Sequence, residues 1–190
     1  MALTLNGSTN TIAGLAVGGL PDGSVDSDTL AAGVGGKFSS YAILADVKGN
    51  NVSGGTFTAG AWRTRDLNTE ISDADSIVSI SSNQFTLSGA GSYLIRCSCP
   101  AFNTNAHQSR IYNISDSNVE QLGYTSFVNA SSGHVVTNSL CSARVTITGS
   151  KTFEIQHYGA ITSSTYGFGV GGNIGNSMIF TIVEIFKEAS

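Results

Sequence analysis

Apolar and polar residues follow one pattern up to about residue 37 and a different one after it. From Tyr41 to Phe186, short apolar runs are separated by turns rich in Gly, Asn and Ser. Runs of this kind predict β-strands, and we expect strands at 41–45, 56–58, 61–67, 76–80, 84–87, 93–99, 108–112, 120–124, 135–140, 142–147, 153–158 and 178–186. Because no helical spacing of apolar residues interrupts them, the pattern predicts an all-β antiparallel sandwich or barrel over 38–190.

The first and last strands of this predicted domain are apolar on both faces. Tyr41–Ala45 is a continuous apolar run. In the closing strand, alternation assigns Met178, Phe180, Ile182 and Phe186 to one face and Ile179, Val183 and Ile185 to the other. A sheet of an antiparallel sandwich buries only one face in its own core, so the second face needs another cover. A second copy of the chain is the simplest cover, and the pattern therefore predicts an oligomer.

Residues 1–37 differ from the rest in being rich in Gly, Ser, Thr and Asp and poor in apolar residues. Glycine at this density makes an independent fold costly in backbone entropy, so we expect an extended arm. Fully extended, such a segment reaches about 120 Å. Its spaced apolar side chains are candidates for docking on another protein, and they are Leu15, Val17, Leu20, Val25 and Leu30.

Charge limits the classes of partner. Only 12% of the residues are charged, against about 25% in a typical soluble domain. Either Ser, Thr and Asn solvate the surface or association covers part of it, and the second alternative agrees with an oligomer. With a net charge of −4 and only 9 Lys and Arg, no face is strongly basic, so we expect no nucleic-acid binding. We find no signal-peptide pattern and no apolar stretch of about 18 residues, so no membrane insertion is expected either.

The cysteines fit neither a disulfide framework nor a zinc site. Cys97 and Cys99 lie on one face of a predicted strand, where they cannot easily bridge each other, and Cys141 is far away in sequence. Their spacing matches no zinc pattern. We expect buried free thiols, as in a protein made in a reducing cytosol.

Four segments resemble the C1q/TNF-like jelly roll. They are Tyr41–Ala45, Asn83–Ile95 with its Gly-Ser-Tyr sequence, Ala143–Ile155 with its Gly-Ser-Lys turn, and Phe180–Phe186. The resemblance implies an antiparallel jelly-roll sandwich whose inner sheet lies against the threefold axis of a homotrimer. The candidate trimer-interface residues that it implies are Tyr41, Ile43, Tyr93, Ile95, Phe153, Ile155, Ile179, Phe180, Ile182 and Val183.

Two further segments, Thr56–Glu70 and Ile12–Gly23, are similar to bacteriophage fibre proteins. This resemblance implies a structural virion protein, made in the bacterial host cytoplasm: a trimeric tail-fibre or spike subunit. Other virion proteins would bind the arm, and a host glycan or protein would contact loops that contain Asn103, Asn105, Asn129, Tyr166 and Asn173. The alternatives are a capsid-decorating protein, such as a head fibre or cement protein, and a capsule-degrading enzyme.

An enzyme is the weaker expectation. Asp66, Glu70, Asp73 and Asp75 could supply a carboxylate pair for glycoside hydrolysis, but the Ser72–Ser76 segment has the composition of a turn, which Asp stabilises. His107, His134 and His157 are dispersed and accompany no nucleophile motif, and a structural role is expected for them. No cofactor motif and no equivalent of the family's calcium site is present, so we expect no cofactor and no metal.

The segment Trp62–Leu67 has two interpretations. It contains the only Trp of the chain next to Arg63, Arg65 and Asp66. Tryptophan with arginine suits a flat polar ligand such as a sugar or a carboxylate. The structural alternative, which we favour, pairs one of the arginines with Asp66, with Glu70 or with a neighbouring subunit.

Overall fold

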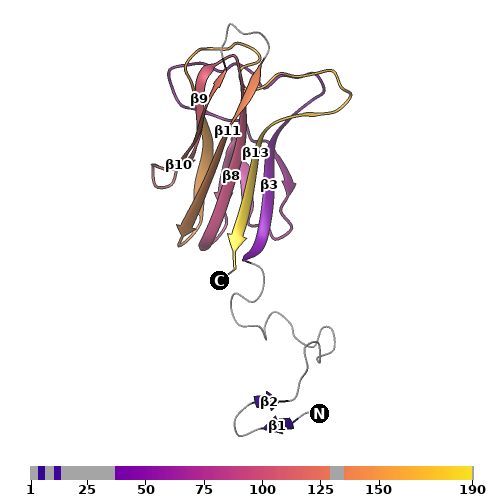
Figure 1. Ribbon diagram of the computed structural model, residues 1–190, viewed down its shortest axis with the longest axis vertical. Helices are drawn as coiled ribbons and strands as arrows, with labels where there is room; N and C mark the ends of the chain where they lie inside the picture. Colours follow the sequence, from indigo (N-terminus) through magenta and orange to yellow (C-terminus); the bar gives the residue numbers. More distant parts are fainter. Residues whose placement is uncertain (1–3, 7–10, 14–36, 129–134, 190) are drawn as a thin grey trace. The chain divides into compact units, whose positions relative to one another are not determined.

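Two antiparallel β-sheets packed face to face make up Phe38–Glu188 (Figure 1). The computed structural model describes residues 4–6, 11–13, 37–128 and 135–189. These residues contain strands and turns and no helix, so none of them forms a helix suited to crossing a membrane. The predicted all-β jelly-roll sandwich is confirmed.

The first sheet brings together strands from both ends and from the middle of this unit. Its order in the described residues is β11–β8–β13–β3–β5, and we call it the five-stranded sheet. The strands are β3 (Phe38–Lys48), β5 (Thr69–Ser72), β8 (Gly91–Phe102), β11 (Val136–Ile147) and β13 (Met178–Glu188). β13 pairs with both β3 and β8, so the last strand of the unit lies in the middle of this sheet.

The second sheet packs behind the first. Its order in the described residues is β10–β9–β12–β7–β6, and β4 pairs with β12 outside that path; we call it the six-stranded sheet. The strands are β4 (Arg63–Thr64), β6 (Val78–Ser81), β7 (Gln84–Leu87), β9 (Asn105–Asn113), β10 (Asn118–Val128) and β12 (Lys151–Gly159).

Alternate residues of the two sheets meet in one apolar core. Its fully buried members include Leu44, Phe85, Leu87, Tyr93, Ile95, Ile111, Phe153, Ile155, Val183 and Ile185. Phe85 and Phe153 stack with their ring centroids 5.6 Å apart, and the Tyr93 hydroxyl donates to the Gly89 carbonyl at 2.9 Å. Each such side chain contributes about 1.5–3 kcal/mol through burial, which makes this core the main source of stability.

At the β10 edge of the sandwich, the backbones of β10 and β11 lie close together. A Cβ at Gly123 would lie 2.7 Å from the Leu140 carbonyl oxygen and 2.6 Å from Ser109 Oγ. Ser139 Oγ donates to the Tyr124 carbonyl at 2.7 Å, and Ser126 Oγ donates to the Asn138 carbonyl at 2.6 Å. Hydrogen bonds of these side chains therefore join β10 to β11 across the two sheets.

Most expected strands lie within observed ones, and the differences have physical reasons. The expected strands 135–140 and 142–147 belong to one strand, β11. The alternation of exposed and buried side chains continues through exposed Leu140 and buried Cys141, so the strand does not end there. The expected strand 61–67 shrinks to Arg63–Thr64, since Arg65 and Leu67 turn into the core. Segment 56–58 makes only an isolated bridge between Phe57 and Ser163. β5 was not expected.

A short β-hairpin lies in the N-terminal region. β1 (Thr4–Asn6) pairs antiparallel with β2 (Thr11–Ala13), with Leu5 opposite Ile12. This pair belongs to a unit separate from Phe38–Glu188. Strands were not expected there. The candidate docking residues Leu15, Val17, Leu20, Val25 and Leu30 lie outside the described residues.

Candidate functional site

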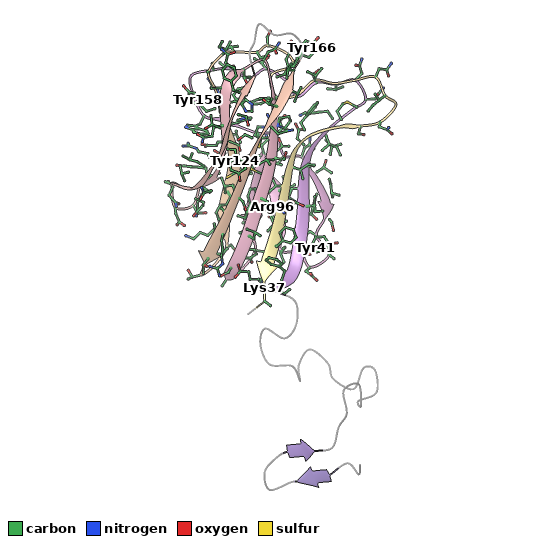
Figure 2. All side chains as sticks on the ribbon, in the orientation of Figure 1. Lys37, Tyr41, Arg96, Tyr124, Tyr158 and Tyr166 are labelled. Atoms are coloured by element: carbon green, nitrogen blue, oxygen red, sulfur yellow. The ribbon has the colours of Figure 1, made fainter. Side chains whose placement is uncertain are left out.

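The outer face of the five-stranded sheet carries exposed apolar side chains from several strands. Tyr41 on β3 is 53% exposed, Leu140 on β11 is 47% exposed, and Ile179 and Ile182 on β13 are 50% and 38% exposed. Ile71 of β5 is exposed as well, and Ile43 is half-buried. Figure 2 shows Tyr41, Arg96 and Tyr124 along this side of the molecule. We call the residues Tyr41, Ile43, Leu140, Ile179 and Ile182 the apolar face.

Four of the ten candidate interface residues lie on this face: Tyr41, Ile43, Ile179 and Ile182. The other six are wrong as surface residues, because they are buried within a single chain. They are Tyr93, Ile95, Phe153, Ile155 and Val183, which are 0% exposed, and Phe180, which is 8% exposed. Phe153 and Ile155 also belong to β12, in the other sheet. Alternation assigns residues to the two faces of a strand, but it does not say which face packs against the other sheet of the same chain.

A register shift in β13 changes which residues point outward. The pairing with β3 skips between Ile179 and Ile182, and both intervening residues, Phe180 and Thr181, are buried. A bulge of this kind reverses the alternation along a strand. Ile179 and Ile182 therefore share the outer face, although strict alternation assigned them to opposite faces.

A groove of about 640 Å³ runs beside the apolar face, where β10 meets β8, β11 and β13. Its apolar lining includes Leu122, Leu140 and Ile182, and the aromatic ring of Tyr124 stands beside them. Arg96 and Glu184 also line the groove, with Arg96 Nη1 and the Glu184 carboxylate 3.8 Å apart. Tyr124 is 72% exposed and Leu122 is 48% exposed. The edge at β10 thus adds exposed Leu122 and Tyr124 to one side of a groove whose other lining includes Leu140 and Ile182 of the apolar face.

The loop that contains Tyr166 lies at the end of the sandwich away from Phe38 and Glu188. Figure 2 shows Tyr166 at this end and Tyr41 toward the other. Tyr166 is exposed and packs edge-on against Phe102, with centroids 6.0 Å apart. Asn173 is exposed, and its amide oxygen accepts a hydrogen bond from Asn50 at 2.8 Å.

The other three candidate loop residues are less suited to contact. Asn103 and Asn105 are half-buried, both have positive φ (49° and 55°), and the Asn103 amide oxygen is buried. Asn129 lies outside the described residues. Tyr166 and Asn173 are therefore the candidates whose surface positions leave them open to a partner.

The arginines of the Trp62–Leu67 segment do not form the expected ion pairs. Arg65 is 1% exposed, and it donates to Thr181 Oγ1 at 2.8 Å, the Pro100 carbonyl at 3.1 Å and the Phe168 carbonyl at 3.0 Å. Its guanidinium also lies 4.4 Å from the centroid of the Phe168 ring. Arg63 donates to the Thr58 carbonyl at 3.1 Å. Asp66 accepts instead from Lys48 at 2.6 Å, and among the described residues neither arginine forms an ion pair with Asp66 or Glu70. The expected pairing within the chain is therefore wrong, and pairing with a neighbouring subunit stays a prediction.

The histidines and carboxylates have structural surroundings. His107 and His157 are buried and hydrogen-bonded to each other at 2.9 Å. Asp73 accepts from the backbone amides of Ile77 and Val78 at 2.9 Å each, which confirms its role in a turn. Within the described ranges, no group of three or more His, Cys, Asp and Glu side chains is arranged to hold a metal ion.

The cysteines are free and buried, as expected. Cys97 lies directly opposite Cys141 in the β8–β11 register, and Cys99 Sγ is 4.0 Å from Cys97 Sγ. Neighbouring thiols and burial raise the pKa of Cys97 well above its ordinary value. The thiol of Cys97 therefore stays protonated and behaves as a small apolar group.

Comparison with known proteins finds similarity in structure alone. No protein-family model and no curated protein matches the sequence. The structure of Eiger TNF from S. frugiperda matches with a TM-score of 0.53 and 10% identity, over 80% of this chain and 93% of that one. Murine APRIL at pH 5.0 matches with a TM-score of 0.50 and 4% identity, over 77% of this chain and 98% of that one. The globular domain of zebrafish complement 1qA protein gives a TM-score of 0.49 and 16% identity, over 78% and 96% of the two chains. Together with the strand order, the first two matches show that this chain has a C1q/TNF-like jelly-roll fold.

Proposed function

We propose that this protein is a structural subunit of a bacteriophage virion: a trimeric tail fibre or spike that contacts the host surface. The single observation that carries the proposed assembly is the apolar face. Its exposed Tyr41, Ile179 and Ile182 lie on adjacent strands, and soluble monomers rarely expose contiguous apolar patches of this kind. Association through this face gives these side chains the cover that they lack in a single chain.

A ring of three subunits needs two different complementary patches on each subunit. The domain offers two: Tyr41, Ile43 and Ile179 of the apolar face, and the β10 edge with Leu122 and Tyr124. In the proposed trimer, the β10 edge of one subunit packs against the apolar face of the next. Arg96 and Glu184, 3.8 Å apart, neutralise each other where the sheet is covered.

The positions of the termini and loops support presentation to a host. Phe38 pairs with Glu188 at one end of the sandwich, and Tyr166 lies at the opposite end (Figure 2). In the proposal, residues 1–37 bind another virion protein, and the loops with Tyr166 and Asn173 face a host glycan or protein. Three identical tips would strengthen a weak contact through effective concentration. The similarity of Thr56–Glu70 and Ile12–Gly23 to phage fibre proteins is the reason for choosing a virion.

Immunoelectron microscopy tests the location. Particles of the phage that encodes this chain are labelled with an antibody against residues 38–190, and the label is expected on tail fibres or spikes. Label on the head would assign the protein to capsid decoration and overturn the fibre proposal. Label on neither, with the protein absent from purified particles by mass spectrometry, would overturn a virion role altogether.

A further inference from the structure

The outer face of the six-stranded sheet, opposite the apolar face, carries a cluster that the proposed assembly does not use. Buried Ile111, Ile155 and His157 face the core, so their neighbours Arg110, Gln156 and Tyr158 point outward. Arg110 lies directly opposite Gln156 in the β9–β12 register. Together with Tyr112 and with Trp62, which precedes β4, these residues form what we call the Arg110 cluster.

Stacking and one hydrogen bond fix the position of the Arg110 guanidinium. Its central carbon lies 4.0 Å from the centroid of the Trp62 ring and 5.1 Å from that of the Tyr112 ring. Its Nε donates to Gln156 Oε1 at 2.7 Å. The Gln156 amide nitrogen in turn donates to the Glu154 carboxylate, which also accepts from Thr64 Oγ1 at 3.2 Å. The guanidinium is therefore held in one orientation before any ligand binds.

The terminal nitrogens of this guanidinium have no anionic partner. Among the residues that the structure describes, no ion pair includes Arg110. By contrast, Arg144 on the other sheet binds both oxygens of Glu188 at 2.7 and 2.6 Å. Partial burial lowers the pKa of Arg110, and the charges of Tyr112 and Glu154 oppose this shift without reversing it. Water therefore solvates this guanidinium less than it solvates a free arginine. A preorganised guanidinium of this kind matches the planar fork of a carboxylate.

Aromatic rings beside the guanidinium add a second type of contact. Tyr158 is 37% exposed, and its ring centroid lies 5.7 Å from that of Trp62. An exposed tyrosine ring combines an apolar surface with a polar hydroxyl, which suits the apolar face of a sugar ring with its surrounding hydroxyl groups. The Gln108 amide donates to the Gly123 carbonyl at 2.9 Å, which fixes the side chain opposite Tyr158 in the register.

We propose that the Arg110 cluster is a binding site for a saccharide that carries a carboxylate. The carboxylate accepts two hydrogen bonds from the terminal nitrogens of Arg110, and the sugar ring lies against Tyr158. Charge complementarity selects this ligand class over a neutral sugar, because the terminal nitrogens of Arg110 form no ion pair among the described residues, whereas the nearby Glu154 carboxylate already accepts from Gln156 and Thr64. The cluster lies on β9, β12 and the segment before β4, and it contains none of the residues that the proposed trimer uses on the apolar face or at the β10 edge. The proposal therefore does not rest on a place in a virion.

Fluorescence tests this site directly, because Trp62 is the only Trp of the chain. The full chain is titrated with three acidic oligosaccharides (galacturonate, mannuronate and hyaluronan) and with neutral malto-oligosaccharides. We expect a saturable change in Trp62 emission with at least one acidic oligosaccharide and none with the neutral series. Raising the salt concentration weakens this binding, since the contact is ionic.

Matched variants assign the effect to Arg110. Arg110→Gln removes the charge and Arg110→Lys keeps it without the fork, and each is expected to weaken binding at least tenfold by calorimetry. Tyr158→Ala, at an exposed position, is expected to weaken binding while leaving the charge in place. The control Arg144→Gln also removes one arginine and is expected to bind like the unaltered chain.

No saturable change with any acidic oligosaccharide, equal binding of neutral ones, or an equal loss in Arg144→Gln would each overturn the proposal. A failure of the virion proposal would leave these titrations unchanged.

Discussion

Acid is expected to destabilise this fold through its buried histidine pair. His107 is 1% exposed and its two ring nitrogens contact His157 at 2.9 Å and Thr137 Oγ1 at 2.7 Å. Burial, together with the charge of Arg65, lowers the pKa of His107 from 6.5 to about 4. The same causes, with His107 itself, lower the pKa of His157 well below its ordinary value. Both rings are therefore neutral in the folded protein at pH 7.

The sign and size of the effect follow from linkage. The unfolded chain binds a proton at His107 near pH 6.5, whereas the folded chain binds it only near pH 4. The stabilisation is thus complete above pH 6.5 and is lost as the pH falls toward 4. For His107 alone, the free energy of unfolding decreases by about 2 kcal/mol between pH 7 and pH 5. His157 acts in the same direction. Asp46 acts in the opposite direction, because burial raises the pKa of its carboxyl.

Urea unfolding at pH 7, 6 and 5 measures this effect, with Trp62 fluorescence as the signal and the protein concentration held constant. The comparison variant is His107→Gln, which keeps hydrogen-bonding groups but does not titrate. We expect the unaltered chain to lose about 2 kcal/mol more than His107→Gln between pH 7 and pH 5. Equal losses in the two proteins would refute the assignment to His107.

Two further predictions use matched pairs of substitutions. Asp73→Ala removes the acceptor of two backbone amides and is expected to lower the free energy of unfolding by about 1–3 kcal/mol. Asp75→Ala, at an exposed position, should change this free energy little. Urea midpoints that shift equally in the two variants would contradict this prediction. Gly123→Ala places a Cβ within 2.7 Å of the Leu140 carbonyl oxygen and is expected to lower the melting temperature by several degrees, while Gly149→Ala, where the added Cβ has open space, should leave it nearly unchanged. Calorimetry that finds Gly123→Ala as stable as the unaltered chain would show that β10 does not pack closely on β11.

The sequence predicts the class of fold well, because alternation of apolar residues is a local property of each strand. Segments 84–87 and 153–158 show this. Buried Phe85, Leu87, Phe153 and Ile155 alternate there with polar residues, most of them half-buried, as the pattern indicates. The bulge at Phe180–Thr181 is different. It depends on how β13 pairs with β3, and no local pattern in Met178–Phe186 marks it.

The candidate site is predicted less completely. Tyr41 and Tyr93 both follow apolar patterns, yet Tyr41 is 53% exposed and Tyr93 is 0% exposed. Which face of a strand meets the other sheet depends on long-range packing, so the sequence pattern does not separate them. Arg65 was expected to be a candidate for an ion pair with Asp66, Glu70 or a neighbouring subunit, and it is buried without one in the part of the chain that the structure describes. Its burial depends on acceptors from Pro100, Phe168 and Thr181, all distant in sequence.

Light scattering of the full chain, with two isoleucine variants, tests the central claim most directly. Ile182→Arg puts a charge on the apolar face, and Ile174→Arg puts the same charge on a loop where Ile174 is 69% exposed. One chain has a mass of 19.6 kDa, so the proposed trimer weighs about three times as much. We predict the trimer mass for the unaltered chain and for Ile174→Arg, and the monomer mass for Ile182→Arg at the same concentration. A monomer mass for the unaltered chain at every concentration, or a trimer that Ile182→Arg leaves intact, would contradict assembly through this face.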